Sequence, residues 1–192
     1  MLYLDDSVES ITEEQTRVWT DELPAWRRSR VEAIRDLRVR ALSVAAFRLL
    51  RSALREEYGM DPVPVFGYGA HGKPFLTGFP DIHFSLSHCR AAVACAVSDH
   101  PVGVDVEVTG RGNERLFAYV LSESERALVR AAADPQEAFT RLWTRKEAFL
   151  KLTGSGLSDS LPSVLESAAA RGALFDTRYN AARGYACTVA RF

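Results

Sequence analysis

Two short acidic stretches, about forty residues apart, carry the side chains in this sequence that are best suited to chemistry. The first is GVDVE, from Gly103 to Glu107. Asp105 and Glu107 are two residues apart, so on a β-strand both carboxylates lie on one face. The β-branched valines beside them then point to the other face, into a core. The pattern predicts a strand that presents a pair of carboxylates opposite its apolar side.

The second stretch is WTRKEAFLKLTGSGL, from Trp143 to Leu157, and its apolar residues recur at helical spacing. Glu147 and Lys151 are four residues apart and therefore share one helix face. Glu147 can face the two carboxylates of the strand. Each stretch alone also fits a simpler explanation, namely a solvated strand face in the first case and a surface ion pair worth about 0.3–0.5 kcal/mol in the second.

The three carboxylates of Asp105, Glu107 and Glu147 have no histidine or cysteine cluster beside them. Such a set favours a hard, oxygen-preferring ion, Mg²⁺ more than zinc. Because Mg²⁺ usually keeps several waters and is completed by substrate phosphates, the combination predicts a magnesium site that acts on a phosphate.

The two stretches in this order and at this separation, GVDVE and then W-T-x-K-E-A-F-x-K-x-x-G-x-G-L, resemble the phosphopantetheinyl transferases. The likeness is to the larger, two-lobed type typified by the surfactin-synthetase activator. It extends upstream through GKP (Gly72 to Pro74), FSLSH (Phe84 to His88) and an arginine-rich N-terminal helix, so it covers most of the chain. The resemblance implies Mg²⁺-dependent transfer of 4′-phosphopantetheine from coenzyme A to a serine of an apo acyl or peptidyl carrier protein, releasing adenosine 3′,5′-bisphosphate.

The resemblance also implies roles for individual residues. Asp105, Glu107 and Glu147 would hold Mg²⁺ on the pyrophosphate, and Glu147, or a metal-bound water that it orients, would accept the serine proton. Lys151 and His88 would join Glu147 as catalytic residues by placing positive charge against the phosphates. The residues expected to bind coenzyme A are Arg27 or Arg28 together with Arg30 at the 3′-phosphate, Arg48 near the adenine, and Lys73, Ser87, His88 and Lys151 at the phosphates.

Two other classes of function stay open. A Mg²⁺-dependent phosphohydrolase would cleave coenzyme A or a nucleotide with water and would need no carrier protein. A non-catalytic module that binds coenzyme A or a carrier would have no need of a metal site and a base together, so the presence of Asp105, Glu107, Glu147 and Lys151 argues against it. The spacer Val106 offers no side-chain ligand, and the C-terminal region is short for the family.

The composition is that of an ordinary soluble globular protein. The 192 residues are 47% hydrophobic and 26% charged, and the formal net charge of −1 gives no field that attracts nucleic acid or an anionic membrane. The three cysteines form no metal-ligand spacing, and the two that lie in apolar strand-like runs are expected to be buried free thiols. No basic and apolar leader and no membrane-length apolar run is present. We expect a cytoplasmic monomer with no nucleic-acid or membrane partner.

The hydrophobic periodicity predicts an α+β fold, and the resemblance implies two similar lobes related by a pseudo-twofold axis, each a small antiparallel sheet packed on a long helix. The N-terminal lobe would span residues 1–100 and the C-terminal lobe residues 101–192. Strands are expected at 2–4, 82–87, 91–98, 101–108, 173–178 and 185–191, with a short extended segment at 62–66 and a glycine-rich loop at 67–73. Helices are expected from Thr12 to a break before Pro24, without interruption at 25–58, after Gly112, at 122–133, at 135–152 and at 163–170. Gly154 and Gly156 would end the 135–152 helix, with Leu157 packing back.

An apolar run between the two acidic stretches is a candidate docking surface for the carrier protein. It comprises Leu116, Phe117, Tyr119, Val120 and Leu121 and is more apolar than one helix stripe needs. Phe117 and Leu121 fit a simple core role as well. Because the chain has no net positive charge to attract acidic carriers, apolar contact is expected to supply much of the affinity.

Overall fold

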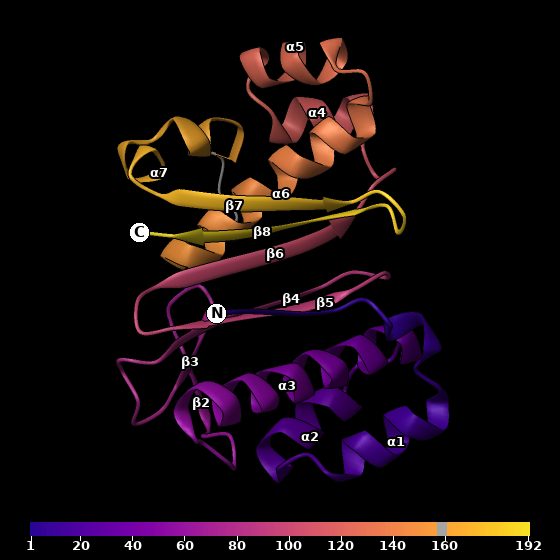
Figure 1. Ribbon diagram of the computed structural model, residues 1–192, viewed down its shortest axis with the longest axis vertical. Coiled ribbons are helices and arrows are strands. Elements are labelled where there is room, and N and C mark those ends of the chain that lie inside the picture. The colour runs from indigo at the N-terminus through magenta and orange to yellow at the C-terminus, as the bar shows by residue number, and fades with distance from the viewer. Residues whose placement is uncertain (157–160) are drawn as a thin grey trace.

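The computed structural model describes residues 1–156 and 161–192 and has an α+β fold (Figure 1). The N-terminal half contains β1 (Leu2–Asp5), a 3₁₀ turn η1 (Val8–Ser10), α1 (Glu13–Asp21), α2 (Ala25–Glu32), α3 (Leu37–Tyr58), β2 (Phe66–Tyr68), β3 (Pro74–Leu76), β4 (His83–His88) and β5 (Val93–Ser98). The C-terminal half contains β6 (Val102–Val108), α4 (Glu114–Val120), α5 (Glu123–Ala131), α6 (Pro135–Thr153), η2 (Leu161–Glu166), α7 (Ala168–Arg171), β7 (Leu174–Asn180) and β8 (Tyr185–Arg191). Leu157, which was predicted to pack back, lies outside the described residues.

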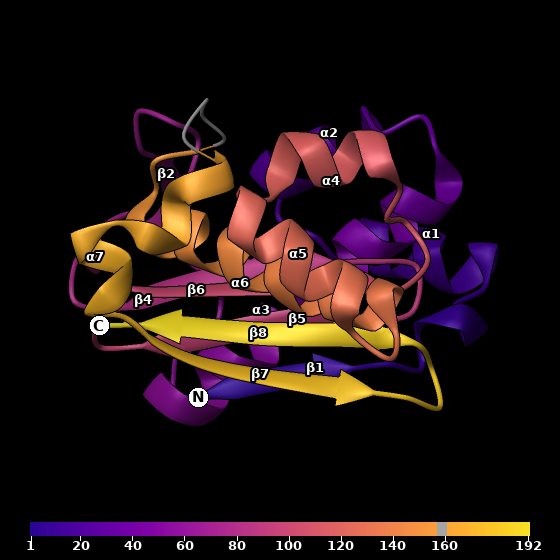
Figure 2. The same cartoon turned by 90° about the horizontal axis from the view of Figure 1, so that it is seen from above.

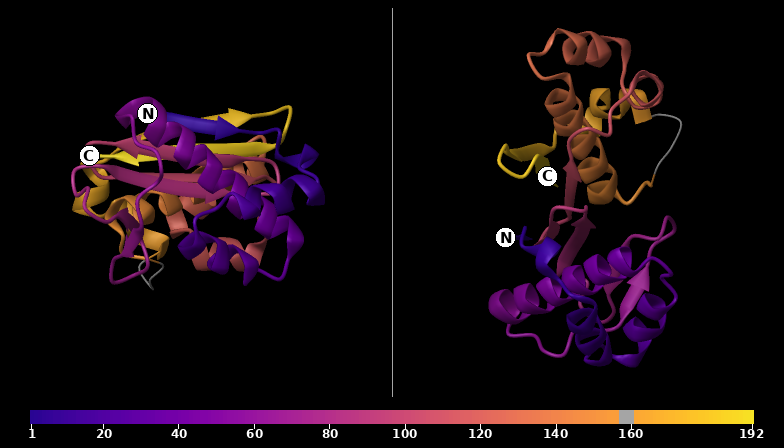
Figure 3. Two further views of the ribbon diagram at one scale, coloured as in Figure 1. Left: turned by 90° about the horizontal axis from the view of Figure 1, so that it is seen from below. Right: turned by 90° about the vertical axis from the view of Figure 1, so that its right-hand side faces the viewer.

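The described strands form three small antiparallel sheets, with strand orders β1-β5-β4, β2-β3 and β6-β8-β7. Helix α3 packs on the first sheet and α6 on the third. In Figure 1 the strands of these two sheets cross the middle of the molecule, with α1 to α3 on one side and α4 to α7 on the other. Figure 2 looks down onto the C-terminal helices, and Figure 3 shows the two halves at opposite ends of the molecule.

Local sequence signals account for many helix boundaries. Thr12 caps α1 and Ser122 caps α5, each as part of a capping box. Gly59 and Gly154 end α3 and α6 in the left-handed conformation, with φ of 63° and 69°, where a residue with a Cβ would be strained. The predicted starts of α1 and α5 and the predicted ends of α3 and α6 are confirmed.

The prediction of one uninterrupted helix over residues 25–58 is wrong, because the chain breaks between α2 and α3. Asp36 caps α3 by accepting a hydrogen bond from the backbone N–H of Val39 at 2.9 Å. The Arg40 guanidinium donates to the carbonyl oxygens of Glu32 and Ile34, at 3.1 and 2.6 Å, and so satisfies acceptors that the end of α2 leaves free. Leu37, the first residue of α3, is 52% exposed.

The two larger sheets meet through an apolar cluster and a row of serine hydroxyls. The cluster includes Ala92, Ala94 and Ala96 of the first half and the four valines of β6. Ser85 and Ser87 of β4 accept hydrogen bonds from the backbone N–H groups of Val104 and Val106, at 3.0 and 3.2 Å. The serines therefore satisfy edge donors of β6 that no strand pairs, and they fix β4 beside β6.

The described part of the chain has no helix that is both long enough and apolar enough to cross a membrane. Cys89, Cys95 and Cys187 are all free and buried, which confirms the prediction made for the two in strand-like runs. The predicted glycine-rich loop at 67–73 is shorter than expected, because Gly67 and Tyr68 belong to β2 of the β2-β3 hairpin.

Candidate active site

A close contact between a strand and a helix brings the two acidic stretches together. A Cβ on Gly103 would lie 2.0 Å from the carbonyl oxygen of Ala148 and 2.5 Å from the backbone nitrogen of Leu152. Only glycine therefore lets α6 lie this close to β6. Since Gly103 and Asp105 are two apart on one strand face, the same face of β6 presents Asp105 to the helix.

Asp105 is the most enclosed of the three predicted carboxylates, with 6% of its surface exposed. Its Oδ1 accepts a hydrogen bond from the Ser87 hydroxyl at 2.8 Å and an ion-paired hydrogen bond from the Lys151 ammonium at 2.7 Å. The buried negative charge is thus paired and hydrogen-bonded, as a stable buried carboxylate requires. The structure brings together Ser87, Asp105 and Lys151, which the sequence predicted from three separate motifs.

Glu107 lies at the end of the same strand face, and both of its carboxylate oxygens are engaged. Oε1 accepts from the backbone N–H of Val108 at 2.8 Å, and Oε2 accepts from the Arg111 guanidinium at 2.5 Å. Sequence reasoning did not assign Arg111 to the site. The signal available was its position four residues after Glu107, across a turn that contains Gly110.

Glu147 has no hydrogen bond or ion pair to any of the described residues, and it lines a cavity of about 320 Å³ together with Lys73, Ser85 and Lys151. Burial raises the pKa of the Glu147 carboxyl, the negative charge of Asp105 raises it further, and the ammonium of Lys151 opposes the shift. A partly buried carboxylate with a raised pKa and free oxygens is suited to accept a proton.

Within residues 1–156 and 161–192, no three acidic, histidine or cysteine side chains lie close enough together to form a metal site as they stand. The donors nevertheless suit Mg²⁺, because Asp105, Glu107 and Glu147 offer only carboxylate oxygens and their charges act on one another. Lys151 and Arg111 hold two of these carboxylates by ion pairs of the kind that a bound cation would replace.

Arg27 and Arg30 of α2 carry positive charge and have no carboxylate partner among the described residues. Arg27 donates from Nη2 to the hydroxyl of Ser43 at 2.9 Å, lies over the Phe47 ring, and has a buried Nε with no hydrogen-bond partner. Burial lowers the pKa of Arg27, and the nearby Tyr68 partly offsets this shift. Arg30 lies 4.3 Å from the centre of the Tyr68 ring. Uncompensated cations of this kind favour an anionic ligand.

The other two predicted arginines have different surroundings. Arg28 donates to the carbonyl oxygens of Asp21 and Leu23. Arg48 pairs with Glu22 at 2.7 Å and lies over the Trp19 ring, so its described contacts are with α1 and the residue that follows it. Arg28, like Arg27, has a buried Nε without a hydrogen-bond partner, and of the four predicted arginines Arg48 alone has a described carboxylate partner.

Lys73 and His88 border the acidic cluster. The Lys73 ammonium donates to the carbonyl oxygens of Val102 and Leu152, at 3.3 and 3.0 Å, and burial lowers its pKa. Although His88 keeps an exposed surface, desolvation lowers the pKa of its imidazole, and the positive charge of Lys151 lowers it further. The lowered pKa favours the neutral imidazole, which can donate an N–H to a phosphate.

The predicted docking run divides between core and surface. Phe117, Val120 and Leu121 are buried, Leu116 is half-buried, and Tyr119 is 61% exposed. The simpler core explanation therefore holds for Phe117 and Leu121, and also for Val120. Leu128 of α5, which lies outside this run, is 68% exposed.

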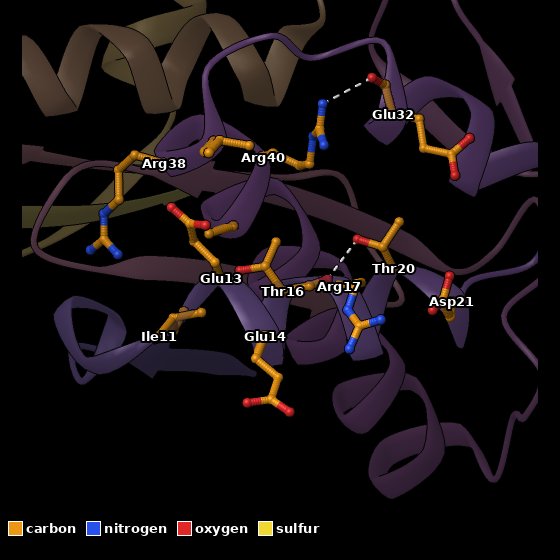
Figure 4. Close-up of a pocket in the computed structure, with 12 residues that line it drawn as sticks. Ile11, Glu13, Glu14, Thr16, Arg17, Thr20, Asp21, Glu32, Arg38 and Arg40 are labelled. Atoms are coloured by element: carbon orange, nitrogen blue, oxygen red, sulfur yellow. Dashed lines mark hydrogen bonds between the residues drawn. The ribbon is translucent and has the colours of Figure 1, made fainter.

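A second cavity, of about 680 Å³, lies in the N-terminal half beside α1 and the junction of α2 with α3 (Figure 4). Its charged lining mixes arginines with carboxylates, including Arg17, Arg38 and Arg40 with Glu13 and Glu14. Arg38 and Arg40 are already engaged by backbone carbonyl groups. None of the predicted site residues lines this cavity, so we place the candidate active site between β4, β6 and α6.

Comparison with known proteins shows the family of the chain. Residues 101–190, which carry both acidic stretches, match the model of the 4′-phosphopantetheinyl transferase superfamily. The chain is 37% identical over 138 residues to the 4′-phosphopantetheinyl transferase AcpT of Salmonella typhimurium, an alignment that covers 66% of this chain and 69% of that protein. The chain belongs to the 4′-phosphopantetheinyl transferase superfamily.

Two Bacillus subtilis members of this superfamily are also similar. One is a 4′-phosphopantetheinyl transferase 36% identical over 118 residues, and the other is the 4′-phosphopantetheinyl transferase Sfp, 33% identical over 118 residues. Each alignment covers 60% of this chain and 53% of the relative, so the chain spans about half the length of these relatives.

Proposed function

We propose that this protein transfers 4′-phosphopantetheine from coenzyme A to a serine hydroxyl of an apo acyl or peptidyl carrier protein and releases adenosine 3′,5′-bisphosphate. The observation that carries the proposal is the meeting of Ser87, Asp105 and Lys151 beside Glu147, at the contact of β6 with α6. Membership of the superfamily points to the same reaction.

In this proposal Asp105, Glu107 and Glu147 hold a magnesium ion, which would neutralise the charge that builds on the pyrophosphate as the phosphoanhydride bond breaks. Lys151 stays close enough to Asp105 to reach a phosphate oxygen on the same side of the site. Ser87 fixes the Asp105 carboxylate by its hydrogen bond to Oδ1. Glu107 would turn away from Arg111 to take part.

Glu147 is the proposed general base. Its raised pKa brings its basicity closer to neutral pH, and no described residue competes for its oxygens. It would accept the proton of the carrier serine as that oxygen attacks the phosphorus atom that carries the pantetheine arm. Because the leaving group is a phosphate of adenosine bisphosphate, most of the rate enhancement is expected from positioning and electrostatics.

Coenzyme A would be held mainly by cations of the N-terminal half. Arg27 or Arg28, together with Arg30, would bind its 3′-phosphate, because none of the three has a carboxylate partner among the described residues. Lys73 and His88 would donate to the other phosphates. Arg48 stays a prediction for the adenine side, and it would have to leave Glu22 and Trp19 to act there.

We also propose that the chain divides near residue 100 into two similar lobes related by a pseudo-twofold axis. The support is that α3 lies on the sheet β1-β5-β4 and α6 lies on the sheet β6-β8-β7, so that each half pairs one long helix with one three-stranded antiparallel sheet. The candidate site lies where the two sheets meet. Three free, buried thiols support a reducing cytoplasm as the compartment.

The test is mass spectrometry of several apo carrier proteins after incubation with coenzyme A, Mg²⁺ and this protein. A mass gain of one phosphopantetheine group on the carrier serine is expected with the native chain and not with Glu147→Gln, which keeps the size of the side chain but not its basicity. Release of adenosine bisphosphate in the absence of any carrier would instead assign the site to a phosphohydrolase.

A further inference from the structure

The ion pair between Glu107 and Arg111 differs from the other contacts of the candidate site because it occupies a proposed metal ligand. Of the three proposed metal ligands, Glu107 is the one whose two oxygens are both taken by the local chain, one by its neighbour's backbone and one by a guanidinium at 2.5 Å. A carboxylate held in this way cannot offer a free oxygen to a metal ion until one of these bonds breaks. The guanidinium is the partner that can leave, because its side chain is 66% exposed.

The fold holds Arg111 in place from both sides. Gly110, with φ of 88°, turns the chain back after β6, a conformation that a residue with a Cβ adopts only with strain. On the other side, the Gln136 side-chain amide accepts from the Gly112 N–H and donates to the Gly112 carbonyl, each at 3.0 Å. This double hydrogen bond anchors the backbone beside Arg111 to the first turn of α6, so the approach of Arg111 to Glu107 is built into the fold.

We propose that Arg111 is a positioning residue that competes with the metal ion for Glu107. In the metal-free protein the guanidinium neutralises Glu107 and draws it towards the β6 turn. When the ion binds, Glu107 exchanges this partner for the metal, and Arg111 is released into the cavity of about 370 Å³ that it shares with His88, Arg90 and Glu107. This inference rests on the proposed magnesium role of Asp105, Glu107 and Glu147.

The geometry sets the size of the effect. Glu107 has 15% of its side chain exposed and Arg111 has 66%, so solvent screens the pair and its strength is that of a surface ion pair. Competition of that strength lowers metal affinity by about two- to fivefold. Removing Arg111 should therefore tighten metal binding without abolishing the site.

The experiment measures Mn²⁺ affinity of the full chain by electron paramagnetic resonance, with Mn²⁺ as a substitute for Mg²⁺. Arg111→Ala is expected to bind Mn²⁺ about two- to fivefold more tightly than the native protein. The matched control is Arg90→Ala, which removes an exposed arginine from the same cavity, one whose guanidinium has no ion pair within the described residues. Arg90→Ala should change Mn²⁺ affinity by less than half as much as Arg111→Ala does.

A second arm separates direct competition from a general effect of charge. In a Glu107→Gln background the competition no longer exists, so adding Arg111→Ala should leave Mn²⁺ affinity unchanged. The inference would be overturned if Arg111→Ala raised Mn²⁺ affinity equally in the native and the Glu107→Gln backgrounds, or if Arg90→Ala raised it as much as Arg111→Ala. Either result would assign the higher affinity to the general loss of a positive charge. If the native protein binds Mn²⁺ and Arg111→Ala binds it no more tightly, the role of Arg111 is overturned and the proposed metal site is not. Native protein that binds no Mn²⁺ overturns the proposed metal site as well.

Discussion

The Ser87 hydroxyl of β4 donates to Oδ1 of Asp105 at 2.8 Å and accepts from the backbone N–H of Val106 at 3.2 Å. A single small side chain thus orients a buried carboxylate and joins the edges of two sheets. The site and the contact between the two halves of the chain share this residue, so a change at Ser87 should affect activity and stability together.

Ser87→Ala should lower the free energy of unfolding by about 1–3 kcal/mol, because a buried carboxylate oxygen and a buried N–H each lose a partner. It should also slow transfer, since Asp105 is then held by Lys151 alone among its described partners. Urea denaturation and a transfer assay measure the two effects. The matched control is Ser85→Ala, which loses the bond from Val104 but none to Asp105. Comparable loss of activity in both variants would contradict an orienting role for Ser87.

Arg27 and Arg30 should distinguish coenzyme A from its 3′-dephospho form. The native protein is expected to bind coenzyme A more tightly, and the Arg27→Ala, Arg30→Ala double variant should lose most of that difference, because a hydrogen bond to a charged group contributes about 1.5–3 kcal/mol. Calorimetry with both cofactors measures it. Arg28→Ala is the matched comparison, since Arg28 is the other candidate on α2 and donates to the carbonyl groups of Asp21 and Leu23. Equal affinity of the native chain for both cofactors would remove these arginines from the site.

His88 should make the ligand-free protein less stable in mild acid. Desolvation, with Lys151 and Arg27 adding to it and Asp105 opposing, lowers the pKa of His88 in the folded chain. The unfolded chain then binds more protons below about pH 6.5, so stability falls as the pH drops through that value towards the lowered folded pKa. Urea midpoints measured across this pH range should decline less steeply in His88→Gln than in the native chain. Identical slopes for the two proteins would show that His88 is not the group responsible.

Tyr119 should contribute to carrier docking, because it is the exposed member of the predicted apolar run. Tyr119→Ala, and to a lesser degree Leu116→Ala, should raise the Michaelis constant for the carrier without changing coenzyme A binding. The control is Leu128→Ala, an equally exposed apolar residue on α5. The Michaelis constant should change little between low and moderate salt if apolar contact dominates. A steep salt dependence with no effect of Tyr119→Ala would instead place docking on a basic surface.

The sequence by itself determined the elements that carry the site and where many of them begin and end. These features depend on short-range physics: alternation places Asp105 and Glu107 on one strand face, a four-residue spacing places Glu147 and Lys151 on one helix face, and polar caps and glycines mark helix ends. The family could be identified from the same local motifs because their order and separation are preserved along the chain.

The tertiary structure alone decided which charged groups meet. At the break between α2 and α3, Arg40 donates hydrogen bonds to the carbonyl groups of Glu32 and Ile34. The spacing of apolar residues along a helix carries no information about these bonds. Arg48 forms an ion pair with Glu22 and lies over the Trp19 ring, and Glu107 forms an ion pair with Arg111. Long charged side chains have many rotamers of similar energy, so their partners are fixed by what the packed fold brings within reach and not by their position in the sequence.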